Sequence, residues 1–149
     1  MRCTRRVICC TPGSNVMKIL IVEDEPTSRE ILSALLDPVG DCIAAEDGLQ
    51  AVNAFKEAMS AHDPFNLIIM DIMMPNASGH EAVRNIRQIE QDNNIKTQDM
   101  VKIIMVTALG DQKNVAHAFF KGGAVSYIVK PVDKKKLYSE LEKLGIIST

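Results

Sequence analysis

An isolated aspartate, Asp71, stands in the apolar stretch LIIMDIMMP, which covers residues 67–75. An ionised carboxylate is costly to bury without a partner, so a carboxyl group in such surroundings is expected to be paired, bound to a metal ion or neutral. Polar residues also follow three other apolar runs of the chain, KILIV, VKIIMV and AVSYIV. These candidate partners of Asp71 are Glu23, Asp24, Thr107 and Lys130.

Brought together, these side chains would suit phosphoryl transfer. The carboxylates of Glu23, Asp24 and Asp71 would repel one another, and a hard divalent cation such as Mg²⁺ relieves that repulsion because it prefers oxygen ligands. Lys130 would neutralise further negative charge, and Thr107 would offer a hydroxyl donor. A nucleophilic carboxylate, with cations and a donor around the transferring group, meets the needs of this reaction. Each residue alone also has an ordinary explanation, as part of a solvated loop, a strand, a turn or a helix cap.

Alternating strands and helices are the elements that would position these residues. Apolar runs predict strands, and apolar residues at helical spacing predict a helix after each of them. The expected strands cover 18–22, 42–45, 66–70, 101–106 and 124–129. The expected helices cover 27–36, 48–60, 79–90, 111–121 and 133–144, with a polar loop over 91–100.

Helix boundaries are marked by capping residues. Thr27 and Glu30 have the spacing of a capping box, and Ser78 with Glu81 could cap the third helix in the same way. Asp133 is expected to open the last helix, and Gly145 to lie just beyond its end.

A doubly wound α/β fold with a five-stranded parallel sheet and five helices follows from this order of elements. Strict alternation of strands and helices places helices on both faces of a parallel sheet. The strands read as unbroken apolar runs, as expected for a sheet that is buried on both sides. In such a sheet the strand ends named above lie along one edge, the carboxyl edge, where open α/β sheets bind ligands.

Composition and charge exclude several classes of protein. The chain has 149 residues, and no apolar run approaches the roughly 20 residues of a membrane helix, so we expect no membrane association. Three of the 17 basic residues lie in residues 1–16, so residues 17–149 carry 14 basic and 19 acidic side chains, a net charge of −5. An acidic domain is a poor non-specific ligand for nucleic acid, and no direct nucleic-acid binding is expected.

Residues 1–16, MRCTRRVICCTPGSNV, differ from the rest of the chain. They hold three arginines, no acidic residue and three of the four cysteines. The apolar stretch VICC is too short for a signal peptide, and we expect a disordered N-terminal extension, with a metal-binding or lipidated tail as the alternative. Cys42 alone in the body builds no disulfide framework, which favours a reducing, cytoplasmic location.

Residues 17–145 resemble the receiver domains of two-component response regulators, of the single-domain type used in chemotaxis. The resemblance rests on four motifs in order: ILIVEDEP, IIMDIMMPNASG, IIMVTA and GGAVSYIVKP. It implies a flavodoxin-like strand order 2-1-3-4-5, a receiver domain over 17–149, and a phosphorylation switch with Mg²⁺ as cofactor.

The resemblance also implies a role for each matching residue. Asp71 is the expected phosphoacceptor, and Thr107 and Lys130 are expected to contact the phosphoryl oxygens. Asp24 and Asp71 are the expected Mg²⁺ ligands, together with the backbone carbonyl of Met73, while Glu23 would act through a metal-bound water. The resemblance further implies a switch formed by Thr107 and Tyr127 and a cis peptide bond before Pro131. It also implies slow hydrolysis of the phosphoryl group, because the apolar Met73 and Leu109 flank the path of the attacking water.

The expected partners are a histidine kinase or a histidine phosphotransfer protein as donor, and a downstream protein that binds the phosphorylated state. On this interpretation the chain is not an enzyme beyond accepting and slowly losing its own phosphoryl group. One alternative is a degenerate receiver that acts only as a protein-interaction module. Another is an aspartyl-phosphate phosphatase, which needs a second aspartate where Met73 stands. A nucleotide- or flavin-binding domain would place glycines where this chain has EDEP.

Overall fold

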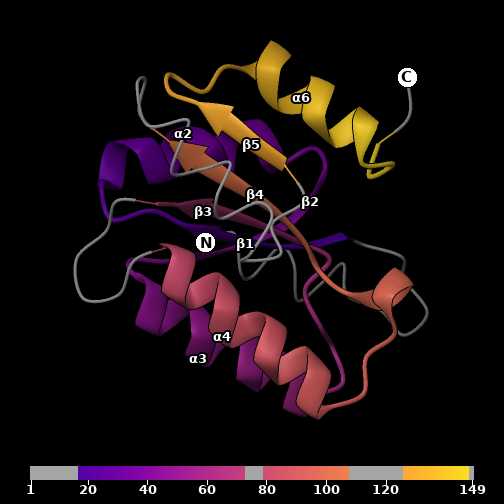
Figure 1. Ribbon diagram of the computed structural model, residues 1–149. Coiled ribbons are helices and arrows are strands. Elements are labelled where there is room, and N and C mark those ends of the chain that lie inside the picture. Colours follow the sequence, from indigo (N-terminus) through magenta and orange to yellow (C-terminus); the bar gives the residue numbers. More distant parts are fainter. Residues whose placement is uncertain (1–16, 73–78, 108–125, 148–149) are drawn as a thin grey trace.

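A computed structural model describes residues 17–72, 79–107 and 126–147, which form a parallel sheet with helices on both faces (Figure 1). The sheet has five strands in the order β2-β1-β3-β4-β5, and every neighbouring pair is parallel. The predicted fold class and strand order are therefore confirmed. The strands are β1 (Met17–Val22), β2 (Gly40–Ala45), β3 (Leu67–Asp71), β4 (Lys102–Thr107) and β5 (Ser126–Val129).

Four α-helices lie in the described part of the chain, two on each face of the sheet (Figure 1). They are α2 (Pro26–Leu36), α3 (Gly48–Ser60), α4 (Gly79–Asp92) and α6 (Lys134–Lys143). Helices α2 and α6 cover one face, and α3 and α4 lie side by side on the other. The fifth helix, expected over 111–121, lies outside the described residues, as do the extension 1–16, Ser78, Met73 and Leu109. None of the described helices has the length and apolar character needed to cross a membrane.

Burial on both faces explains why the central strands are apolar without interruption. In β1, Ile19 and Ile21 pack toward α2 and α6, whereas Leu20 and Val22 pack toward α3 and α4. All four side chains are fully buried. Successive side chains of a strand point to opposite faces, so a strand covered on both sides needs apolar residues at every position.

Strand register aligns the ends of the central strands at one edge of the sheet. Val22, the last residue of β1, pairs with Met70, and Asp71 pairs with Val106. Asp71 and Thr107 are the last residues of their strands, one residue beyond the predicted ends. The sheet therefore brings the polar residues that follow its apolar runs to a common place.

The cap of α2 differs from the predicted capping box of Thr27 and Glu30. The Glu25 side chain is the cap, and its Oε1 accepts hydrogen bonds from the backbone N–H groups of Thr27 at 2.6 Å and Ser28 at 3.2 Å. Pro26 then occupies the first helical position, where its missing N–H costs nothing. The predicted capping box was wrong because Pro26 begins the helix, so the N-cap is Glu25, two residues before Thr27.

The predicted limits of the last helix are confirmed. Asp133 is its N-cap and accepts a hydrogen bond from the Lys136 backbone N–H at 2.8 Å. Gly145 follows the helix with φ of 76°, a left-handed conformation that glycine adopts without steric cost.

Residues 91–100 contain more regular secondary structure than the predicted polar loop, and a buried glutamate precedes them. Helix α4 continues to Asp92, and a short 3-10 helix covers Thr97–Asp99. The Glu90 side chain, which is 1% exposed, accepts the Val101 backbone N–H at 2.7 Å and the Arg87 guanidinium at 2.6 Å. Glu90 thereby ties the end of α4 to the start of β4.

Replacing Glu90 by alanine is expected to lower the free energy of unfolding by about 3 kcal/mol, because it leaves a buried N–H and an arginine without their acceptor. Urea denaturation measures this loss. Glu142→Ala, at an exposed position of α6, is the control and is expected to change stability by no more than about 0.5 kcal/mol. Equal stability of the two variants would show that Glu90 does not hold this connection.

Candidate functional site

Three carboxylates converge at the carboxyl edge of the sheet. Glu23 follows β1 and is 1% exposed, Asp71 ends β3 and is 3% exposed, and Asp24 is exposed. One carboxylate oxygen of each residue lies within 4.8 Å of the others. The parallel pairing of β1 with β3 places them there, so the structure brings together the acidic residues that the sequence singled out.

Lys130 bridges two of these carboxylates. Its Nζ lies 3.3 Å from Asp71 Oδ2 and 3.4 Å from Glu23 Oε1. Burial alone would lower the pKa of Lys130, but the neighbouring charges of Asp71 and Glu23 outweigh it and raise the pKa above its usual 10.5. The lysine is therefore positively charged at neutral pH, beside the expected acceptor. The peptide bond between Lys130 and Pro131 is cis, as the resemblance implied.

Thr107 lies at the end of the strand next to Asp71. It is buried, and its carbonyl oxygen accepts the Lys130 backbone N–H at 2.7 Å. Since Asp71 pairs with Val106, Thr107 is one residue further along β4, toward the same edge. The structure therefore places a hydroxyl group on the strand beside the acceptor.

The donor set of this site fits a hard divalent cation. It consists of carboxylate oxygens, which Mg²⁺ prefers, and the exposed Asp24 leaves one side open to solvent. Asp24 and Asp71 would hold the ion, and Glu23 would act through water. The expected carbonyl ligand, Met73, lies outside the described residues.

The pKa of Glu23 is raised from 4.5 to about 7, mainly because the group is buried, and in part by its hydrogen bond with Asp71 and the charge of Asp71. The Glu25 N–H, 3.2 Å from Glu23 Oε2, and the charge of Lys130 oppose this rise without cancelling it. Glu23 therefore keeps a proton in the metal-free protein up to about neutral pH.

The affinity for Mg²⁺ is expected to increase as the pH rises from 6 to 8, by up to about tenfold per pH unit below the pKa of Glu23, since a cation must displace its proton. Calorimetric titrations across this range measure the effect. Glu23→Gln should flatten the dependence, while Glu30→Gln, an exposed position on α2, should keep it. If Glu23→Gln keeps the pH dependence of the wild type, the proton that competes with Mg²⁺ is not on Glu23.

The same raised pKa has a consequence for the stability of the metal-free protein. The folded state keeps the Glu23 proton up to a pH of about 7, whereas the unfolded chain loses it near 4.5. The stability contributed by this proton is therefore complete below about pH 4.5 and is lost as the pH rises to about 7.

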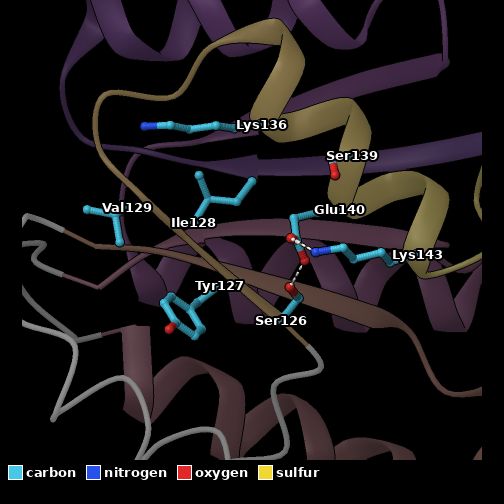
Figure 2. Close-up of a pocket in the computed structure, with 8 residues that line it drawn as sticks. All are labelled: Ser126, Tyr127, Ile128, Val129, Lys136, Ser139, Glu140 and Lys143. Carbon is cyan, nitrogen blue, oxygen red and sulfur yellow. Dashed lines mark hydrogen bonds and ion pairs between the residues drawn. The ribbon is translucent and has the colours of Figure 1, made fainter.

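Tyr127, the expected switch residue, lies in β5 with 42% of its surface exposed. It lines a surface pocket of about 510 Å³ between β5 and α6. Figure 2 shows the Glu140 carboxylate of this pocket between the Ser126 hydroxyl and the Lys143 ammonium, which lies 3.1 Å from Glu140 Oε2. The switch itself stays a prediction, as do the roles of Met73 and Leu109, which lie outside the described residues.

The sequence did not predict that Arg29 contacts this site. Its Nη1 donates to the carbonyl oxygen of Glu23 at 2.9 Å and lies 3.5 Å from that of Asp24. The sequence offered one weak sign, an arginine in the first turn of a helix, where the helix dipole disfavours positive charge.

Sequence comparisons relate the chain to known signalling proteins. Residues 19–142 match the response regulator receiver domain family. The chain is 35% identical over 128 residues to the chemotaxis protein CheY of Bacillus subtilis, which covers 85% of this chain and 95% of that protein. It is 37% identical over 125 residues to the probable transcriptional regulator ycf27 of Guillardia theta, covering 83% of this chain and 43% of that protein.

Several of the matching proteins are much longer than this chain. The chain spans 47% of the ycf27 protein of Porphyridium aerugineum and 7% of hybrid signal transduction histidine kinase I of Dictyostelium discoideum. The activities of those whole proteins therefore do not transfer to this chain by similarity alone.

Solved structures with the same fold include two protein complexes. The receiver domain of Ssk1, in complex with the histidine phosphotransfer protein Ypd1 of Saccharomyces cerevisiae, matches with a TM-score of 0.74 and 30% identity, over 87% of this chain and 89% of that one. The CheX-CheY-BeF3-Mg complex of Borrelia burgdorferi matches with a TM-score of 0.72 and 26% identity, over 87% and 89%. Together with the match over residues 19–142, the fold and the acidic edge of the sheet establish that the chain belongs to the response regulator receiver domain family.

Proposed function

We propose that this receiver domain accepts a phosphoryl group on Asp71, in an Mg²⁺-dependent reaction, from a histidine kinase or a histidine phosphotransfer protein. One observation carries the proposal: the buried Asp71 carboxylate contacts Lys130 and lies within 4.8 Å of Glu23 and Asp24. A degenerate receiver has no need of this complete set. The contact with Lys130 puts one cation next to the carboxylate that would carry the phosphoryl group.

In the proposed reaction an Asp71 carboxylate oxygen forms a bond to phosphorus while the bond from phosphorus to the donor histidine nitrogen breaks. The imidazole leaves with that electron pair. The Lys130 ammonium and the Thr107 hydroxyl would hold the phosphoryl oxygens, as preorganised donors do in phosphoryl transfer. A bound Mg²⁺ would neutralise part of the negative charge there, held by Asp24 and Asp71. Turnover is limited to the chain's own acyl phosphate, so we do not class it as an enzyme.

Signalling by the phosphorylated chain would proceed through another protein. A phosphoryl group adds a charge of about −1.5 to −2 and strong acceptors, so a partner that contacts the site can distinguish the two states. A partner that prefers the phosphorylated state also favours phosphorylation, by linkage. The proposal draws support from the receiver domains of similar sequence that were solved with partner proteins.

Transfer from a purified phosphohistidine protein tests the donor part of the proposal. Label on the donor is expected to move to the wild-type chain within minutes when Mg²⁺ is present. Excess EDTA is expected to slow the transfer by about 100-fold or more, since the charges around the acceptor are then left uncompensated. Transfer at the same rate in EDTA would contradict a metal-dependent reaction, and no transfer from any phosphohistidine donor would contradict the donor class.

A further inference from the structure

We propose that Arg29 is a positioning residue for the cation site: it holds the loop from Glu23 to Glu25 so that the Glu23 and Asp24 carboxylates face Asp71. Arg29 reaches the loop from the first turn of α2, and its guanidinium binds backbone carbonyl oxygens rather than the carboxylates themselves. The inference rests on the proposed function, because it concerns Mg²⁺ binding at that site.

The hydrogen bond from Arg29 Nη1 to the Glu23 carbonyl, at 2.9 Å, is the main contact. It is partly buried and joins residues six positions apart, so it spans the whole turn from β1 into α2. The same nitrogen lies 3.5 Å from the Asp24 carbonyl. One guanidinium group therefore fixes the carbonyl oxygens of both acidic residues at the end of β1.

The opposite side of the loop is fixed by Glu25. Its backbone N–H donates to Glu23 Oε2 at 3.2 Å, and its carboxylate caps α2 through the N–H groups of Thr27 and Ser28. The Glu23 N–H is engaged as well, with the Ala45 carbonyl of β2 at 3.1 Å. Arg29 completes this set, since among the described residues its side chain is the one seen to bind the carbonyl oxygens of Glu23 and Asp24.

Electrostatics explains why the loop needs such a restraint. When all three carboxyl groups are ionised they repel one another within 4.8 Å, and an unrestrained loop would relieve that repulsion by moving Asp24 away from Asp71. A cation would then have to draw the loop back, which weakens its binding. Arginine suits the task because its planar guanidinium is always charged and presents several donors in a fixed geometry.

The position of Arg29 in the helix supports this role over a purely local one. A positive charge in the first turn opposes the helix dipole, so Arg29 is not there to stabilise α2 by itself. If it acted only on fold stability, its loss would weaken the protein without changing the affinity for Mg²⁺.

The test compares Mg²⁺ binding by the full chain in wild type and in Arg29→Met, measured by calorimetric titration at pH 8. Arg29→Met is expected to bind Mg²⁺ about tenfold more weakly, the lower end of the effect of removing a group that orients metal ligands. Arg29→Lys keeps the charge and one donor and is expected to lose less. Arg87→Met is the matched control, since it removes a half-buried arginine that holds Glu90 instead, and it should keep wild-type Mg²⁺ affinity.

Amide hydrogen exchange in the metal-free protein gives a second readout. The Glu25 amide is expected to exchange faster in Arg29→Met than in wild type and Arg87→Met, because the loop from Glu23 to Glu25 is no longer held by the Arg29 side chain. Unchanged Mg²⁺ affinity in Arg29→Met would overturn the inference, and so would unchanged exchange at Glu25. If Arg29→Met does not fold, the Arg29→Lys titration decides: weaker Mg²⁺ binding than wild type supports the inference, and equal binding overturns it.

The outcomes separate this inference from the proposed function. Wild-type protein that binds Mg²⁺, beside an Arg29→Met protein that binds it equally well, overturns the role of Arg29 alone. Wild-type protein that binds no Mg²⁺ overturns both the role of Arg29 and the metal dependence of the proposed reaction.

Discussion

Asp71→Asn is expected to abolish phosphoryl uptake, with labelling at least about 1,000-fold below wild type, because the reaction loses its only nucleophile. Asparagine has nearly the shape of aspartate and can still accept a hydrogen bond from Lys130, which lies 3.3 Å from Asp71 Oδ2. The amide nitrogen and oxygen are poor nucleophiles toward phosphorus. The substitution therefore removes the chemistry while it keeps the packing of a site that is almost fully buried.

Intact-protein mass spectrometry after incubation with a small-molecule phosphodonor and Mg²⁺ measures this loss. Asp63→Asn is the control, since Asp63 is an exposed aspartate paired with Lys18, away from the acidic edge. Asp63→Asn should gain one phosphoryl group as wild type does. Labelling of Asp71→Asn at the wild-type level would mean that another residue is the acceptor.

Asp24→Asn is expected to weaken Mg²⁺ binding by about 100-fold, or roughly 2.7 kcal/mol, because the cation loses a charged ligand a few ångströms away. This loss is smaller than the Coulomb energy of about 4 kcal/mol between unit charges 4 Å apart near a protein surface, since solvent screens the exposed Asp24. Asparagine keeps a carbonyl oxygen at the same place. The change therefore isolates the contribution of charge.

Glu46→Gln is the matched control for Asp24→Asn. Glu46 is an exposed acidic residue that follows β2, the edge strand, and so carries a negative charge beyond the same end of the sheet. Calorimetric titration at pH 8 is expected to show less than a twofold change for Glu46→Gln, because water and salt screen exposed charges. Similar losses in both variants would indicate that the cation responds to the general field of the protein and not to a ligand at Asp24.

The strands and the site were predictable from the sequence for the same physical reason. A strand buried on both faces needs an apolar run, and a polar residue directly after such a run lies at an edge of the sheet. Asp71, Thr107 and Lys130 were found in this way. The predicted strand ends fell one residue short at Asp71 and Thr107, because the backbone ladder continues one residue beyond the apolar run.

The features that the sequence did not reveal depend on contacts between distant elements or on competing local choices. Glu90 looks like a surface residue of a helix, and its burial follows from the Val101 N–H of the next strand. At the start of α2, Glu25 and Thr27 both had side chains able to cap, and Pro26 decided between them. Arg29 could not be assigned before the turn that brings it back onto Glu23 was known.

Locating the phosphoryl group by reductive trapping tests the central claim most directly. Wild-type protein is incubated with a phosphodonor in Mg²⁺ or in EDTA, treated with borohydride, which reduces an aspartyl phosphate to homoserine, and digested for peptide mass spectrometry. Homoserine at position 71 in the Mg²⁺ sample, and little or none in EDTA, is the result that we predict. Homoserine at another aspartate, a phosphoryl group on a different residue type, or equal trapping in EDTA would contradict the account.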